Sequence, residues 1–92
     1  MHAIWEIKMT YEYTPVGVCS RKIYIEVEDD IIKDVAFLGG CSGNTQGVAR
    51  LSVGRSIDEV IGLLEGIKCG PKSTSCPDQL AKALKQIKAG NN

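Results

Sequence analysis

The chain has 92 residues, of which 43% are hydrophobic, so the whole of 1–92 suits one domain with a small core. Eleven basic side chains balance eleven acidic ones, and this balance gives no overall attraction to nucleic acid or to a membrane surface. No apolar segment approaches the ~20 residues that a membrane helix needs. The first residues lack a basic region followed by an apolar run, so we expect no signal peptide and a cytoplasmic protein.

The first half of the sequence predicts three β-strands. Apolar and polar residues alternate over residues 5–13 and again over 22–28, and a period of two is typical of half-buried strands. Asp29 and Asp30 mark a tight turn, and residues 31–38 form the third predicted strand. Short connections between consecutive strands predict an antiparallel meander.

The second half predicts three helices. Ser56 and Glu59 form a predicted capping box, in which each side chain accepts a hydrogen bond from the other's backbone N–H. Pro77 suits the first position of the last helix, because its missing N–H has no partner there, so we place Cys76 at the N-cap. The apolar residues at helical spacing are Val48, Ala49, Leu51, Ile57, Val60, Ile61, Leu64, Leu80, Leu84 and Ile87. Strands followed by helices predict an α+β domain with the three helices packed on one face of the sheet.

The four cysteines carry the strongest functional signal. Cys19, Cys41, Cys69 and Cys76 all lie in turn sequences at the ends of predicted elements. Cysteines that serve as small hydrophobes usually occupy core positions instead. Cys41 and Cys76 precede helices, whose N-terminal partial charge stabilises a thiolate, the form that binds metal. We therefore predict a four-thiolate metal site, for which His2 is a poor further ligand.

The spacing of the cysteines leaves other interpretations open. Successive cysteines are 22, 28 and 7 residues apart, so the pattern contains no C-x-x-C pair and matches no standard zinc finger or ribbon. A Cys69–Cys76 disulfide and unrelated free thiols are the alternatives. Asn44, which follows a glycine-rich stretch, could cap a helix or hydrogen-bond a thiolate, and capping is the commoner role.

The residues Thr74-Ser75-Cys76-Pro77-Asp78 spell the signature of the TSCPD domain family, and segments 17–20, 39–44 and 66–69 also match. The chain thus resembles a free-standing TSCPD domain, which otherwise occurs at the C-terminus of adenosylcobalamin-dependent ribonucleotide reductases. The resemblance implies that the four cysteines are metal ligands. It also implies a link to deoxyribonucleotide synthesis, with a ribonucleotide reductase as partner.

The order of elements and cysteines is also similar to that of NifU/IscU-type iron–sulfur scaffolds. The cysteines that match their three cluster ligands are Cys19, Cys41 and Cys76. Arg21 stands where the scaffolds carry Asp, and Ser75 stands where they often carry His, so the labile ligands are absent and Ser75, like Asn44, is expected beside the site. Cys69 supplies a fourth thiolate, and an all-thiolate site is typical of structural zinc. An iron–sulfur cluster is the alternative, because four cysteines hold clusters too.

These features predict four functions. The first is a zinc-binding accessory module of ribonucleotide reduction. The second is a component of ribonucleoside-diphosphate reductase with redox-active cysteines, although 92 residues cannot enclose radical chemistry by themselves. The third is an iron–sulfur carrier. The fourth is a nucleic-acid module using Lys82, Lys85 and Lys88, which a solvated helix face explains more simply, so nucleic acid is not the expected partner.

Overall fold

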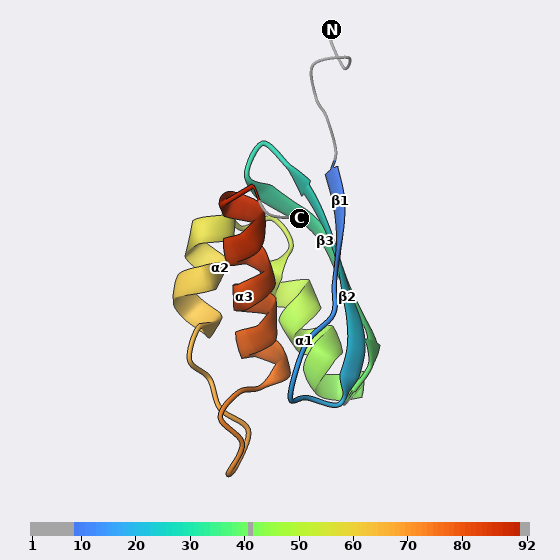
Figure 1. Cartoon of the computed structure of the whole chain (residues 1–92). Helices are drawn as coiled ribbons and strands as arrows, with labels where there is room; N and C mark the ends of the chain where they lie inside the picture. The colour runs from blue at the N-terminus through green and yellow to red at the C-terminus, as the bar shows by residue number, and fades with distance from the viewer. Residues whose placement is uncertain (1–8, 41, 91–92) are drawn as a thin grey trace, which may run out of the picture.

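The computed structural model describes residues 9–40 and 42–90, and their elements follow the predicted α+β order (Figure 1). The strands are β1 Met9–Tyr13, β2 Ser20–Glu28 and β3 Ile31–Gly39, and the helices are α1 Ser42–Ser52, α2 Ile57–Leu64 and α3 Cys76–Lys88. Residues 5–8 of the predicted first strand lie outside the described residues. Within the described part of the chain, every helix is too short or too polar to cross a membrane.

The strands form an antiparallel meander in the order β1-β2-β3, as predicted. Asp29 and Asp30 connect β2 to β3, and both have positive φ, at +53° and +64°. A type I′ hairpin turn requires positive φ at both central residues, and Asp adopts that conformation more readily than most residues. The Asp-Asp pair therefore sets the register of this hairpin.

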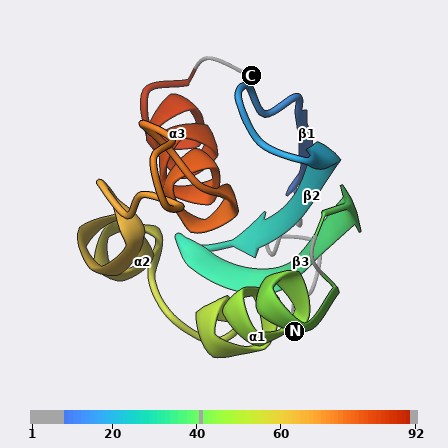
Figure 2. The same cartoon turned by 90° about the horizontal axis from the view of Figure 1, so that it is seen from below.

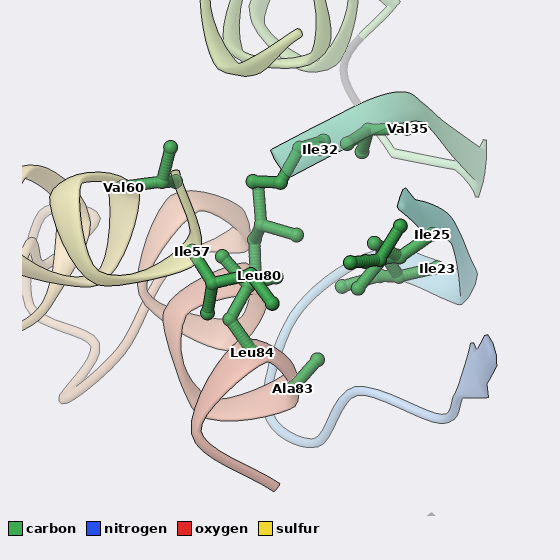
Figure 3. Packing of buried hydrophobic residues seen from close by; sticks show 10 residues of the cluster. Ile23, Ile25, Ile32, Val35, Ile57, Val60, Leu80, Ala83 and Leu84 are labelled. Carbon is green, nitrogen blue, oxygen red and sulfur yellow. The ribbon is translucent and has the colours of Figure 1, made fainter. Parts of the chain in front are cut away.

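All three helices lie on the same side of the sheet (Figures 1 and 2), with α1 packed against β3 and α2 packed against α3. The core forms where side chains of α2 and α3 meet those of β2 and β3 (Figure 3). The largest fully buried side chains are those of Ile23, Ile25, Ile32, Ile57, Val60, Leu80 and Leu84. The positions on β2, α2 and α3 follow the strand or helix period expected for their elements, so the buried faces of these three elements are confirmed. Met9 of β1, which belongs to the apolar face of the first predicted strand, is 46% exposed.

A β-bulge near the start of β2 changes which side chains face the helices. The register with β3 shifts between Ser20 and Lys22. Strict alternation outward from buried Ile23 would turn Arg21 inward and Ser20 outward. The bulge reverses this, since Ser20 is 3% exposed and Arg21 is exposed. A single extra residue thus aims a hydroxyl at the interior instead of a guanidinium.

Helix α1 differs from the prediction in the face that it buries. Leu51 was expected to point inward, but its side chain is 69% exposed. Thr45 and Ser52 are buried instead, at 5% and 3% exposure, and Val48 and Ala49 between them are half-buried. The inward face of α1 therefore carries two buried hydroxyl side chains beside half-buried Val48 and Ala49. The apolar residues of the sequence were not sufficient to identify this face.

Helix α2 begins as predicted, but its capping box is only half formed. The Ser56 hydroxyl oxygen accepts a hydrogen bond from the Glu59 N–H at 3.1 Å. The Glu59 carboxylate pairs with the Arg55 guanidinium at 2.6 Å rather than with the cap. A nearby cation competes successfully for the carboxylate, because an ionic partner is stronger than a backbone N–H.

We predict that Leu80→Ala lowers the free energy of unfolding by about 3 kcal/mol, because it empties a core position that is 0% exposed. Leu51→Ala is the matched control, since the same atoms are removed from a side chain that is 69% exposed, and it should change stability by less than about 0.5 kcal/mol. Urea unfolding followed by circular dichroism measures both values. Equal losses in the two variants would contradict the assigned core.

Candidate metal site

Three of the four predicted cysteines line one pocket, although they come from distant parts of the sequence. Cys19 lies just before β2, Cys69 lies in the loop between α2 and α3, and Cys76 is the first residue of α3. The pocket has a volume of about 340 Å³, and we call it the cysteine pocket. Its other lining residues are Val18, Asn44, Ile67, Lys68, Lys72, Ser75 and Pro77. Asn44 and Ser75, the two residues expected beside the site, are among them.

Cys41 and His2 lie outside the described residues, so the structure does not place them. A Cβ on Gly40 would come within 3.2 Å of the Ser20 Cβ, and Asn44 lines the cysteine pocket. Among the residues that the structure describes, no three His, Cys, Asp or Glu side chains are close enough to hold a metal ion together.

The three described cysteines are free thiols. Cys19 and Cys69 are exposed, whereas Cys76 is buried, with 7% of its surface exposed. The alternative Cys69–Cys76 disulfide is not formed in this structure. The pocket therefore combines one buried thiol presented by a helix with two thiols presented by loops.

The N-cap of α3 is Ser75, and the prediction of Cys76 at this position was wrong. Ser75 has the extended backbone of a cap, with φ −153° and ψ 170°, and its hydroxyl oxygen accepts from the Asp78 N–H at 3.2 Å. Cys76 and Pro77 are the first two helical residues. Proline is tolerated at either position, because no N–H in the first turn has an intrahelical partner. A hydroxyl also accepts hydrogen bonds better than a thiol, and the Cys76 side chain is thus left to line the pocket.

The capping role expected for Asn44 was also wrong. Helix α1 begins at Ser42, so Asn44 lies within its first turn rather than before it. Its side chain is exposed at the edge of the cysteine pocket. The alternative role, a hydrogen bond to a thiolate, stays a prediction.

The motif residues Thr74 to Asp78 are all buried, and their hydrogen bonds attach the α2–α3 loop to α3. The Thr74 hydroxyl donates to the Asp78 carboxylate, which also accepts from the Gly66 N–H at 2.7 Å. The Ser75 hydroxyl donates to the Ile67 carbonyl at 2.6 Å. Both ends of the segment that carries Cys69 are therefore attached to the start of α3.

Gln79 attaches the β1–β2 connection to the same helix turn. Its amide nitrogen donates to the Thr74 hydroxyl at 3.0 Å, and its amide oxygen accepts from the Val16 N–H at 3.0 Å. The chain passes so close here that a Cβ on Gly17 would lie 3.3 Å from the Thr74 methyl. Because Cys19 follows two residues later, Gln79 helps to position the first cysteine. Sequence reasoning missed Gln79, whose only signal is a polar residue next to the motif.

The buried carboxylate of Asp78 is ionised and well compensated. Its hydrogen-bond donors are the Thr74 hydroxyl and the Gly66 N–H. These donors, together with the charge of Lys82, lower the pKa of Asp78 despite the opposing effect of burial. Burial and the negative charge of Asp78 raise the pKa of Tyr13, whose hydroxyl donates to Gln79 at 3.4 Å.

Comparison with known proteins identifies one family. The model of the TSCPD domain matches residues 6–88 of the chain. No curated protein and no solved structure gives a significant match, so the similarity to NifU/IscU scaffolds stays a prediction. Three residues of the signature, Thr74, Ser75 and Asp78, take part in the hydrogen bonds described above, and Cys76 lines the pocket.

We predict that Asp78→Asn lowers the free energy of unfolding at neutral pH by about 2 kcal/mol, because it removes a buried charge-assisted hydrogen-bond network. The pKa of Asp78 is lower in the folded protein than its ordinary value of 3.8. Its stabilisation is therefore complete above that value and is lost as the pH falls through the lower folded pKa. The variant should show a smaller acid-induced loss of stability than the wild type.

Urea unfolding at pH 7 and at a series of acid pH values measures this difference. Asp34→Asn is the matched control, since it makes the same change at an exposed carboxylate of β3, and should change the free energy of unfolding at pH 7 by less than about 0.5 kcal/mol. If the free energy of unfolding of Asp78→Asn fell with pH in parallel with that of the wild type throughout the acid range, the role assigned to the carboxylate would be contradicted.

Proposed function

Because the chain belongs to the TSCPD domain family, which is found in ribonucleotide reductases, we propose that it is a metal-binding accessory module of ribonucleotide reduction in the cytoplasm. The proposed ligands of a zinc ion are Cys19, Cys41, Cys69 and Cys76. One observation carries the proposal: three of these thiols line a single pocket although the first and last are 57 residues apart in the chain.

The chemistry of the pocket suits thiolate ligands. Cys76 lies in the first turn of α3, where the partial positive charge of the helix favours a thiolate. Lys68 and Lys72 line the same pocket, and their ammonium groups offset part of the negative charge that several thiolates bring together. Four thiolates without an open coordination position would make a bound zinc ion a structural crosslink.

Of the described ligands of this crosslink, one lies on a helix and two lie in loops. Cys76 is buried on α3, and the hydrogen bonds of Ser75 and Gln79 bring the segments of Cys69 and Cys19 to the same turn. Closing the site would join the start of β2, the α2–α3 loop and α3. A domain of this size gains much of its stability from such a crosslink, because it buries only a modest core.

We propose that the partner is a protein rather than a nucleic acid. Of the three lysines on the outer face of α3, Lys85 pairs with Glu65, and Lys88 pairs with Asp30 at 3.3 Å. A lysine that pairs with a carboxylate of its own chain offers less net charge to phosphate. The lysine-rich face is thus better explained by ion pairs within the domain.

We predict that protein purified without added metal contains about one zinc ion per chain, as a closed four-thiolate site requires, and is colourless. Elemental analysis and the absorption spectrum measure these two properties. A brown protein that contains iron and sulfide would contradict the zinc site and favour an iron–sulfur cluster. Metal-free protein with a reversible Cys69–Cys76 disulfide would favour the redox component of the reductase.

We also predict that Cys76→Ser lowers the melting temperature of the metal-loaded protein by more than about 10 °C, because losing a ligand of a structural metal removes folding free energy. Wild type and variant, both treated with a chelator, are the control. The difference between their melting temperatures should then become much smaller, because chelation leaves no bound metal for the variant to lose. A difference of the same size before and after chelation would show that Cys76 acts through packing alone.

A further inference from the structure

We propose that Ser20 is a positioning residue of the cysteine site, whose hydroxyl donates a hydrogen bond to the sulfur of Cys76. This inference rests on the proposed function and adds to it a residue outside the four ligands. The Ser20 oxygen and the Cys76 sulfur are 3.2 Å apart. The two side chains are buried, at 3% and 7% exposure, so the bond is shielded from water.

The local backbone is built to bring the two atoms together. The bulge between Ser20 and Lys22 turns Ser20 toward the helices, where strict alternation would have placed Arg21. On the other side of Ser20, Gly40 has φ +84° and approaches so closely that a Cβ there would lie 3.2 Å from the Ser20 Cβ. The serine is therefore held between β3 and the first turn of α3, with its hydroxyl against the thiol.

Metal binding would set the direction of this hydrogen bond. In the free thiol either atom can be the donor. A cysteine sulfur that binds a metal has lost its proton and can only accept, so the Ser20 hydroxyl becomes the donor. Such a bond holds the orientation of the sulfur and withdraws electron density from it. Partners of this kind typically change metal affinity by 10–100-fold.

Cobalt(II) bound to the full chain provides the test, because its sulfur-to-metal charge-transfer band reports the electron density on the thiolates. Ser20→Ala should bind cobalt about tenfold more weakly than the wild type, and its charge-transfer band should move to lower energy. Ser52→Ala is the matched control. Ser52 is also 3% exposed, but its hydroxyl donates to the Val48 carbonyl at 2.8 Å. Its loss should leave the cobalt affinity and the band unchanged.

A second pair of variants separates the hydroxyl from the packing of the side chain. Ser20→Thr keeps the hydroxyl, so its charge-transfer band should stay at the wild-type energy. Valine has nearly the same shape as threonine but no hydroxyl, so the band of Ser20→Val should move to lower energy. If Ser20→Ala does not fold, this pair decides the question.

The outcomes also separate this inference from the proposed function. A Ser20→Ala or Ser20→Val band at the wild-type energy overturns the role of Ser20, whatever the stability of the variant. A shift of equal size in Ser52→Ala overturns it as well. A wild-type protein that takes up no cobalt overturns both this inference and the metal site.

Discussion

The arrangement of this domain depends on a buried polar network at the first turn of α3. Thr74, Asp78 and Gln79 are each less than a tenth exposed, and their side chains hydrogen-bond to one another and to two other segments. One segment is the β1–β2 connection at Val16, and the other is the start of the α2–α3 loop at Gly66. Since buried polar groups are costly when unpaired, the network permits one arrangement of these loops. The cysteine pocket lies beside this network, which positions the loops that carry Cys19 and Cys69.

The residues of the TSCPD signature thus have different structural roles. Ser75 caps the helix and also holds the Ile67 carbonyl. Asp78 holds the Gly66 N–H, and Pro77 occupies a position where its missing N–H has no cost. Because these residues meet the structural needs of the helix start, Cys76 is left with no capping role. Its sulfur lines the pocket and contacts the Ser20 hydroxyl.

Close backbone approaches at glycine residues bring the outer segments to this turn. Gly17 and Gly40 both have positive φ, at +78° and +84°. A side chain at Gly17 would press on Thr74, and a side chain at Gly40 would press on Ser20. Glycine is suited to both positions, because it adopts positive φ without strain and lets one chain segment touch another. The family resemblance included both glycines, and the structure gives each of them a packing role around the proposed metal site.

Local patterns in the sequence determined the order of the elements, the Asp29-Asp30 turn and the buried faces of β2, α2 and α3. These features follow from periodicity and turn chemistry, which act between near neighbours. Tertiary contacts alone decided that Ser20 rather than Arg21 points inward, that Leu51 is exposed, and that Gln79 reaches Val16. The cysteines could be listed from the sequence, but the meeting of Cys19, Cys69 and Cys76 at one pocket could not be derived from their spacing. It depends on a bulge, on close glycine contacts and on hydrogen bonds such as that between Val16 and Gln79, which are 63 residues apart. Local patterns act between near neighbours and do not determine contacts over such separations.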